Sequence, residues 1–541
     1  MKKLSLLFVL LSTLQLFCQE DAWVFLKDKP SSSTYLEAPL SILSQRALDR
    51  RARQNIALDS KDVPVHAPYY TQIKSTAGIT VLAKSKWLNA IHVQGTQSAI
   101  AALSGTFSFV ERVEFANNSL NAKQRVSQSS LDTNHRNKFS NLESEINYGD
   151  ATTQIAMLRG DYLHQKGFTG AGMQIAVMDA GFPNVNVLNG FEGLIDNNQI
   201  LGGYDFVNRS DVFYSGHNHG TNVLSDIGGS IDEVFIGTAP QASFYLFITE
   251  DVANEVPLEE SLWVEAAEKA DSLGVDVINT SLGYTTFDNA NYNYSYDDMD
   301  GKTTFISRGA EIGASRGMIL VNSAGNSGSN AWKYIGAPAD AASVFSVGAV
   351  NENRDIAAFS SFGPTSDNRV KPDVLAHGQS VFVLDHVSGN PKTSNGTSFS
   401  SPIMAGVIAC FWQAFPNLTN MEIMQRIRES ADRYAVPDPQ HGYGIPNFEF
   451  AYTTLFNELE SKSLKEVSIY PNPVEDRFTL AYNGNDLHKL SIQIFNSIGM
   501  TVYENQSLNS TIVNISKLAA GVYVLKIKSG KQQKEIKLMK K

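Results

Sequence analysis

Four residues in the middle of the chain have the side chains that acyl transfer requires. Asp179 ends the apolar run IAVMD, and His219 opens the stretch HGTNVLSDIGG. Asn326 ends MILVNSAGN, and Ser398 lies in SNGTSFSSPIMAG. A serine becomes a nucleophile when a histidine takes its proton, a carboxylate orients that histidine, and an amide can donate to the oxyanion that forms. The order Asp, His, Asn, Ser therefore predicts chemistry through an acyl intermediate.

The elements that must position these residues are predicted to be strands of a buried parallel sheet. Five runs are apolar throughout, without the alternation of a half-buried strand. They are MQIAVMDAG (173–181), ASFYLFIT (242–249), VDVINTSLG (275–283), GMILVNSAGN (317–326) and SVFSVGAV (343–350). Between them, residues 257–274 have helical spacing, with Pro257 in the first turn and Gly274 as a stop. This alternation predicts an α/β fold whose functional side chains lie beyond the carboxyl ends of the strands.

Ser398 is predicted at the amino end of a helix that is apolar on nearly all sides and therefore central. The free N–H groups and the partial positive charge at a helix start favour a nearby oxyanion. The neighbouring Ser400 and Ser401 are interpreted as caps that satisfy those N–H groups.

The quoted motifs resemble those of the subtilisin-like serine proteases, or subtilases, over residues 149–454, where NTSLG and KPDVLA also match in the family's order. The resemblance implies a parallel sheet with helices on both faces. It implies that Asp179, His219 and Ser398 form a catalytic triad and that Asn326 donates to the oxyanion. Two positions depart from the family pattern, since Asn222 replaces a common histidine and His377 a common proline. Neither belongs to the triad.

The same resemblance implies which residues line the substrate cleft, with their backbones pairing to an extended peptide by strand addition. These residues are Ser281, Leu282, Gly283, Ser323, Ala324 and Gly325.

Composition shifts divide the chain into six predicted segments. They are a signal peptide (1–19), a small α+β domain (20–117), a linker (118–148), the peptidase domain (149–455), a second linker (456–466) and a small all-β sandwich (467–541). In the α+β domain we expect one helix within residues 40–54 and one extended stretch over residues 78–94. The α+β domain resembles a subtilase propeptide, an inhibitor and folding aid. The last segment resembles the carboxy-terminal sorting domain of type IX secretion.

Length and composition set limits on function. The chain has 541 residues, 43% of them hydrophobic and 18% charged, with a formal net charge of −11. This balance gives no reason to expect nucleic acid as a partner. Cys18 falls in the predicted signal peptide, which leaves Cys410, in the apolar stretch VIACFWQAF, without a disulfide partner and as a core residue.

Several other motifs have a default interpretation and an open alternative. His217 competes with His219 as a base but lacks the following Gly-Thr, and His441 is interpreted as a loop residue. The acidic stretch YDDMDGKT (296–303) could bind calcium, although Tyr296 stands at the first ligand position of the calcium-loop template. The default there is a solvated acidic turn, no metal ligand is assigned, and calcium remains open.

The sequence thus predicts a serine endopeptidase made as a zymogen, secreted or held at the surface of a Gram-negative bacterium. Expected partners are protein or peptide substrates, its own propeptide and the secretion machinery, with no cofactor and a monomeric state. One alternative is a catalytically inactive subtilase scaffold acting as a surface binding module. Another, an esterase of the α/β-hydrolase type, would need a Gly-x-Ser-x-Gly elbow and the order Ser, Asp, His, which the chain lacks.

Overall fold

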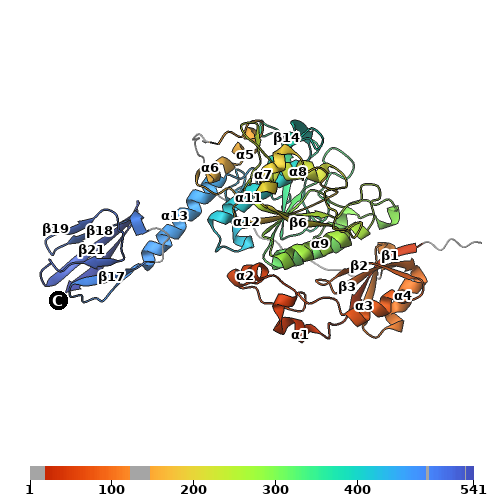
Figure 1. The fold of residues 1–541 in the computed structure, drawn as a ribbon, viewed down its shortest axis with the longest axis horizontal. Coiled ribbons are helices and arrows are strands. Elements are labelled where there is room, and N and C mark those ends of the chain that lie inside the picture. Colours follow the sequence, from red (N-terminus) through yellow and green to blue (C-terminus); the bar gives the residue numbers. More distant parts are fainter. Residues whose placement is uncertain (1–18, 122–145, 483–486, 531) are drawn as a thin grey trace, which may run out of the picture. The chain divides into compact units, whose positions relative to one another are not determined.

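The computed structural model describes residues 19–121, 146–482, 487–530 and 532–541, shown as a ribbon in Figure 1. The chain forms two compact units, residues 1–448 and 449–541. The predicted signal peptide and most of the first predicted linker lie outside the described residues. No helix in the described ranges has the length and apolar character needed to span a bilayer.

The centre of the first unit is a seven-stranded sheet in which all neighbouring strands pair in parallel. In spatial order its strands are β13 (Val374–His377), β12 (Val344–Val350), β11 (Ile319–Ser323), β10 (Val277–Thr280), β5 (Gln174–Asp179), β9 (Ser243–Ile248) and β6 (Ile200–Asp205). Each of the five predicted runs contains one strand, so the predicted fold class is confirmed. Strands β6 and β13 were not predicted, because glycines interrupt the first and the apolar run of the second is only residues 374–376, between Asp373 and His377.

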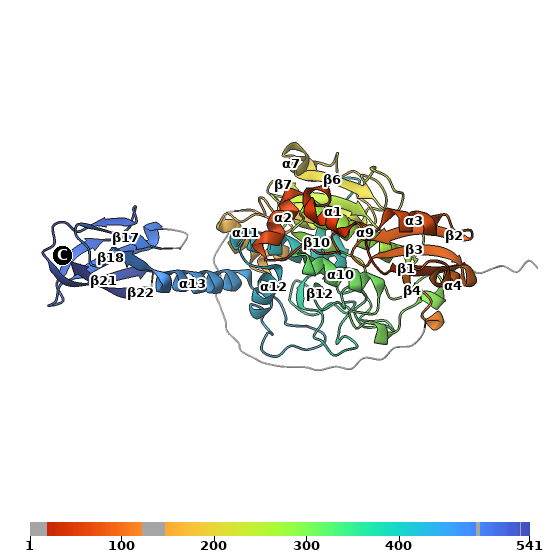
Figure 2. The same cartoon turned by 90° about the horizontal axis from the view of Figure 1, so that it is seen from below.

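Four long helices cover the sheet. Helices α8 (His219–Gly228) and α11 (Thr397–Ala414) pack together over one face, and α9 (Leu258–Leu273) and α10 (Phe305–Ser315) over the other (Figures 1 and 2). Helix α9 ends at Gly274, whose φ of 91° is left-handed and suits glycine. Strand β5 lies between β9 and β10, where the chain order reverses, so its carboxyl end is the switch point at which such sheets carry their sites.

Shorter elements complete the first unit around this sheet. They are α5 (Thr152–Ala156), α6 (Gly160–Gln165), α7 (Glu192–Asp196), α12 (Asn420–Glu429), the strand pair β7 (Ser230–Ile231) and β8 (Phe235–Ile236), and the hairpin β14 (Gln379–Leu384) and β15 (Pro391–Asn395).

An amino-terminal domain, residues 19–121, has an antiparallel sheet of order β2-β3-β1-β4. Its elements are β1 (Gln19–Leu26), α1 (Ser32–Glu37), α2 (Gln45–Arg53), α3 (Ala67–Lys74), β2 (Ile79–Ser85), β3 (Ala90–Thr96), α4 (Gln97–Thr106) and β4 (Val110–Phe115). The expectation of one extended stretch over residues 78–94 was wrong, since β2 and β3 form a hairpin there. The turn contains Asn89 at a φ of 49°, a left-handed conformation that asparagine tolerates.

This domain packs against α9 and α10, as both views indicate (Figures 1 and 2). Trp23 stacks on Phe305 with ring centroids 4.7 Å apart, and its indole N–H donates to Ser261 Oγ at 2.9 Å. The carboxylate of Glu268 accepts hydrogen bonds from the backbone N–H groups of Lys86 and Trp87, at 3.1 and 2.9 Å. The contact therefore combines aromatic packing with buried polar bonds.

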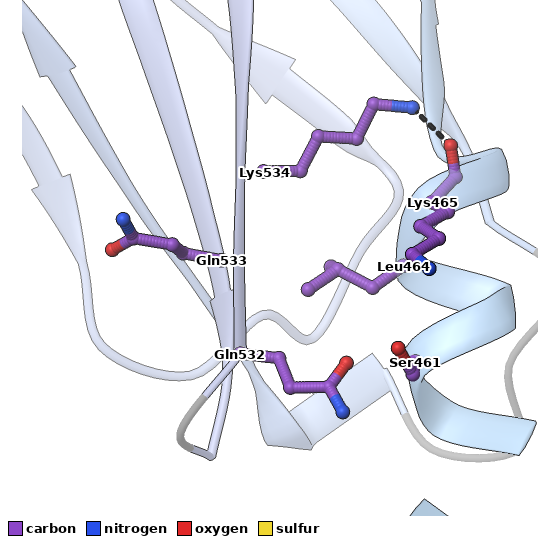
Figure 3. Close-up of a pocket in the computed structure, with 6 residues that line it drawn as sticks. All are labelled: Ser461, Leu464, Lys465, Gln532, Gln533 and Lys534. Atoms are coloured by element: carbon purple, nitrogen blue, oxygen red, sulfur yellow. Dashed lines mark hydrogen bonds between the residues drawn. The ribbon is translucent and has the colours of Figure 1, made fainter. Parts of the chain in front are cut away.

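The second unit contains most of α13 (Phe448–Glu466) and two antiparallel sheets. One sheet contains β16 (Ser468–Tyr470), β17 (Arg477–Ala481) and β20 (Ile512–Asn514), and the other β19 (Thr501–Asn505), β18 (Leu490–Phe495), β21 (Gly521–Ser529) and β22 (Gln532–Lys540). This all-β arrangement confirms the predicted sandwich. Residues 456–466, the second predicted linker, form the last turns of α13. Lys534 bonds the carbonyls of Lys465 and Val467 at the helix end, and Leu464 points toward β22 (Figure 3).

Candidate active site

The carboxyl end of β5 and the first residue of α8 bring together an acid and an imidazole. The Nδ1 atom of His219 lies 2.8 Å from Oδ1 and 3.0 Å from Oδ2 of Asp179. Asp179 is buried, whereas 29% of the His219 side chain is exposed. Because Nδ1 donates to the carboxylate, the other ring nitrogen, Nε2, is left free to accept a proton.

A glycine after the histidine lets α8 lie directly against the tip of β5. A Cβ atom on Gly220 would sit 2.4 Å from the carbonyl oxygen of Gly181 and 2.9 Å from Cβ of Asp179. Real Cβ atoms do not come this close to backbone, so any larger residue would push the helix away. The glycine of the HGT motif is thus explained by close approach.

The charge of Asp179 changes the basicity of the imidazole. Burial lowers the pKa of His219, but the charge of Asp179 and the hydrogen bond to it outweigh burial, so the pKa lies above its ordinary value. The pair therefore stabilises a positive imidazolium, which is the form that a general base must reach.

Ser398 is the second residue of α11 and is buried. The ring of the next residue, Phe399, lies 5.8 Å from the ring of His219, measured between centroids. The hydroxyl of Ser398 donates to the carbonyl of Ser281 at 3.2 Å. Among the described residues no hydrogen bond joins Ser398 to His219, because the Ser398 hydroxyl points to the carbonyl of Ser281.

A proline in the second turn of α11 explains a bond between the helix and the end of β10. Pro402 has no N–H group, so the carbonyl of Ser398 lacks its usual partner within the helix. The hydroxyl of Ser281 donates to that carbonyl at 2.9 Å. Asn279 in turn donates to Ser281 Oγ at 3.2 Å and accepts from Ser401 Oγ at 2.7 Å. A buried chain of hydrogen bonds therefore fixes the start of α11.

The interpretation of Ser400 and Ser401 as helix caps was wrong. Ser400 Oγ donates to the carbonyl of Thr397 at 3.0 Å, and Ser401 Oγ donates to the side chain of Asn279. Both residues lie inside the helix rather than before it, so their hydroxyls bond acceptors and do not cap the first N–H groups of α11.

The side chain of Asn326 is held by its oxygen. Its Oδ1 accepts from the backbone N–H and the hydroxyl of Thr397, at 2.9 and 3.0 Å. The NH₂ group is therefore free of these bonds, and Nδ2 lies 3.5 Å from where a Cβ on Gly396 would be. The amide is oriented to donate into the space in front of the start of α11.

The six residues predicted to line the cleft lie at the ends of two adjacent strands. Residues 281–283 follow β10, and residues 323–325 end and follow β11. The side chain of Asn322 bridges the two segments, since its Nδ2 donates to the carbonyls of Leu282 and Ser323, at 3.0 and 2.9 Å. The structure brings the six residues together beside Ser398, and their contact with substrate remains a prediction.

A second buried pair near the end of β5, Glu250 and Tyr284, was not predicted from the sequence. Glu250 lies just past β9, beside β5, where the N–H of Thr249 donates to the carbonyl of Asp179 at 3.1 Å. The hydroxyl of Tyr284 lies 2.7 Å from both carboxylate oxygens of Glu250. Burial raises the pKa of Glu250 to about 8, although the bond from Tyr284 opposes the shift. Like Asp179, Glu250 follows an apolar run, and that signal was available in the sequence.

Comparison with known proteins decides the family. Residues 170–445, more than half of the chain, match the model described as "Subtilase family". The chain is a subtilase. Residues 21–133 match "Peptidase S8 propeptide domain, Bacteroidota", and residues 468–541 match "Secretion system C-terminal sorting domain". The resemblance found in the motifs is therefore confirmed for the family, the propeptide and the sorting domain.

Curated relatives of this subtilase are serine proteases of moderate similarity. "Serine protease AprX" of Bacillus subtilis is 28% identical over 333 residues, which cover 56% of this chain and 70% of that protein. "Subtilisin DY" of Bacillus licheniformis is 28% identical over 300 residues, covering 55% of this chain and 97% of the relative. Among solved structures, MycP1 from Mycobacterium smegmatis is 23% identical, with a TM-score of 0.44, covering 60% of this chain and 89% of the other.

The remaining candidate residues of this subtilase lie apart from the Asp179–His219 pair. His217 makes no contact with Asp179, and its Nδ1 accepts the backbone N–H of His219 at 3.3 Å. His441 lies in a turn and pairs with Asp438. His377 ends β13 in a buried position, and burial lowers the pKa of its imidazole. Cys410 is fully buried, which confirms its assignment to the core.

The acidic stretch 296–303 does not have the geometry of a calcium loop. Asp298 accepts from the N–H and hydroxyl of Ser295, and Asp300 accepts from the N–H groups of Lys302 and Thr303. Both carboxylates therefore form hydrogen bonds within the turns in which they lie. In the described ranges no three His, Cys, Asp or Glu side chains gather as metal ligands would. Calcium binding there stays the open alternative that the sequence allows.

We expect Gly220→Ala to separate His219 from Asp179, because the added Cβ overlaps the tip of β5. The pKa of His219 should fall, and the midpoint of thermal unfolding should drop by the equivalent of about 1–3 kcal/mol, the usual cost of overpacking. Histidine NMR titration and a thermal melt measure both. Gly193→Ala in α7 is the matched control, since no atom lies within 4 Å of its added Cβ. An unchanged His219 titration in Gly220→Ala would contradict the account.

Proposed function

We propose that this subtilase is a secreted serine endopeptidase in which Asp179, His219 and Ser398 form the catalytic triad. The observation that supports this most strongly is the 2.8 Å contact between His219 and Asp179 beside the buried start of α11. The family match supports a serine-type peptidase in general, and the geometry supports these residues in particular.

In this mechanism the hydroxyl of Ser398 rotates from the carbonyl of Ser281 toward Nε2 of His219. As its oxygen attacks the carbonyl carbon of a peptide bond, the proton passes to Nε2, and Asp179 stabilises the imidazolium without being protonated. His219 then protonates the leaving amine, which departs and leaves an acyl group on Ser398. Water, activated by the same imidazole, releases that group. The chemistry uses only side chains, backbone and water.

The oxyanion that forms at each step would receive two hydrogen bonds. One comes from the backbone N–H of Ser398 at the positive end of α11, and the other from the NH₂ group of Asn326. Thr397 holds Asn326 by its oxygen, so the donor is oriented before substrate arrives. Preorganised donors of this kind cost no rearrangement during the reaction.

The substrate would bind as an extended strand between residues 281–283 and residues 323–325. Backbone groups at the ends of β10 and β11 would pair with the peptide main chain, which gives affinity without a strict sequence requirement. Protein and peptide substrates follow from this arrangement.

The flanking domains fit a zymogen that leaves the cell. The sorting domain implies secretion to the cell surface or the medium, and the propeptide domain implies synthesis as a precursor. We propose further that residues 20–117 inhibit the protease until they are cut away, that a signal peptide occupies residues 1–19, and that the chain acts as a monomer at the surface of a Gram-negative cell or beyond.

Labelling with a fluorophosphonate tests the nucleophile. We expect stoichiometric attachment at Ser398 in the matured protein, located by peptide mass spectrometry, and no attachment in Ser398→Ala. Ser400→Ala, two residues along the same helix, should label like the parent. A folded, processed parent that stays unlabelled would favour the inactive scaffold over the enzyme.

Replacing Asn326 by alanine removes the proposed amide donor. We expect kcat to fall with little change in KM, and the size of the fall to be about 10²–10³-fold, the range known for removal of the equivalent amide in subtilisin, a member of this family. Steady-state kinetics on a chromogenic peptide measure both constants. Turnover equal to that of the parent would remove Asn326 from the oxyanion site.

The pH dependence of kcat/KM should report the neutral imidazole of His219. Because the pKa of His219 is raised above 6.5, the rate should reach half its plateau at a pH above that value. Asp179→Asn removes the charge that raises the pKa, so burial then moves the midpoint below 6.5 while the rate falls about 10⁴-fold. A parent midpoint clearly below 6.5 would argue against His219 as the base.

A further inference from the structure

Helix α2 of the propeptide domain lies against the carboxyl end of α9, away from the sheet contact described above (Figures 1 and 2). The helix starts at Ser44, whose N–H donates to the carbonyl of Ser272 at 2.8 Å. Gly274, the residue that ends α9, has no room for a side chain here, because a Cβ would lie 2.8 Å from the backbone nitrogen of Ala47. The two helices therefore meet backbone to backbone.

Arginines of α2 bond carbonyl groups at the end of α9 and just beyond it. Arg50, which has no exposed surface, donates to the carbonyls of Val275 and Asp271. Arg46 donates to the carbonyl of Gly274 at 3.0 Å and pairs with the carboxylate of Asp276. The last carbonyls of a helix carry partial negative charge, so cations there are stabilising.

Next to these carbonyls, Asp271 is the centre of a buried cluster of ion pairs. Arg50 and Arg51 both bond its carboxylate, with Arg51 at 2.8 Å from each oxygen. Burial alone would raise the pKa of Asp271, but these two arginines hold it below its ordinary value, so the group stays charged. Arg51 also reaches Asp62 of its own domain at 2.9 Å.

The charges of this cluster are paired across the contact, and both arginines that pair with Asp271 come from the propeptide domain. Arg316 of the protease body bonds Asp59 at 3.2 Å and lies 3.5 Å from Asp62, so three arginines face three aspartates. The propeptide domain contributes Arg50, Arg51, Asp59 and Asp62, and the body contributes Asp271 and Arg316. A polypeptide without the two arginines would bury Asp271 unpaired, which costs far more than a missing surface ion pair.

This contact lies at the amino ends of the strands of the central sheet, whereas the candidate active site lies at their carboxyl ends. Asp276 precedes β10, whereas residues 281–283, which follow β10, lie beside Ser398. A helix bound at the end of α9 can therefore stay in place whether or not the cleft is occupied.

We propose that Asp271 and the carbonyl end of α9 form a recognition site for the arginine pair of α2, by which the protease retains its own propeptide after the maturation cut. The inference rests on the proposed function in one respect, namely that the propeptide inhibits the site at Ser398. It adds a second anchor, independent of the cleft, that selects a helix with two adjacent buried arginines.

The test uses the full chain with Ser398→Ala, so that no self-digestion occurs, and with a site for a specific added protease placed between residues 122 and 145. After that cut, size-exclusion chromatography and dissociation kinetics give the affinity of the cut propeptide for the body. We expect the parent to stay associated, and Arg50→Gln with Arg51→Gln to raise Kd about 100-fold or more. Arg53→Gln, an exposed arginine of the same helix, is the matched control and should leave Kd close to that of the parent.

Asp271→Asn guards against a misfolded propeptide, because it leaves the propeptide sequence intact. It should weaken binding as well, and combining it with the arginine changes should cost less than the sum of the two, as expected for direct partners. A parent that releases its propeptide at once, or arginine variants that remain folded by circular dichroism and bind as tightly as the parent, would overturn the proposal. Binding is measured without catalysis, so failed fluorophosphonate labelling of Ser398 would refute the proposed function and leave this result standing.

Discussion

The contact between the start of α8 and the tip of β5 sets the geometry of the candidate site. It exists because Gly220 has no side chain, which lets the helix lie over the backbone of Gly181 and places His219 within 2.8 Å of Asp179. The strand order of the sheet also contributes to this geometry. Since β5 lies where the strand order reverses, its end is open to receive a helix from the side, and β10 and β11 end at the same edge.

The hydroxyl groups around Ser398 have separate tasks. Ser281 donates to the carbonyl of Ser398, Ser401 bonds α11 to Asn279, and Thr397 orients the amide of Asn326. Each group is buried and has a partner, which is the condition under which polar side chains can be kept in a core without loss of stability. In the proposed mechanism, the hydroxyl of Ser398 exchanges its bond to the carbonyl of Ser281 for one to His219.

Features with a local cause could be predicted from the sequence. Continuous apolar runs predicted five strands of the central sheet, and the motifs around Asp179 and His219 picked out two residues that the structure brings into contact. The pattern missed β6, because Gly202 and Gly203 dilute its apolar character. It also joined β2 and β3, because the turn at Asn89 has no glycine or proline to mark it.

Features that depend on distant parts of the chain could not be predicted in this way. Helix α2 was expected from its spacing, yet nothing within residues 40–54 indicates that Arg50 is buried against Asp271, which lies far along the chain in another domain. The partners of Ser400 and Ser401 were misjudged for a related reason. A hydroxyl near a helix start fits a cap by local rules, and only the packing of α11 on β10 gives Ser401 a better acceptor.

Pro402 has a consequence for how the protein responds to heat. The helix lacks one internal hydrogen bond, because Pro402 cannot donate to the carbonyl of Ser398. The hydroxyl of Ser281, which follows β10, donates to that carbonyl instead. Fraying of the first turn of α11 therefore removes a bond that holds residues 281–283, the segment along which a peptide would lie. Movement of that segment in turn removes a bond that holds the first turn of α11. On heating, the ordered structure around Ser398 and that of residues 281–283 should therefore be lost together, in a single step.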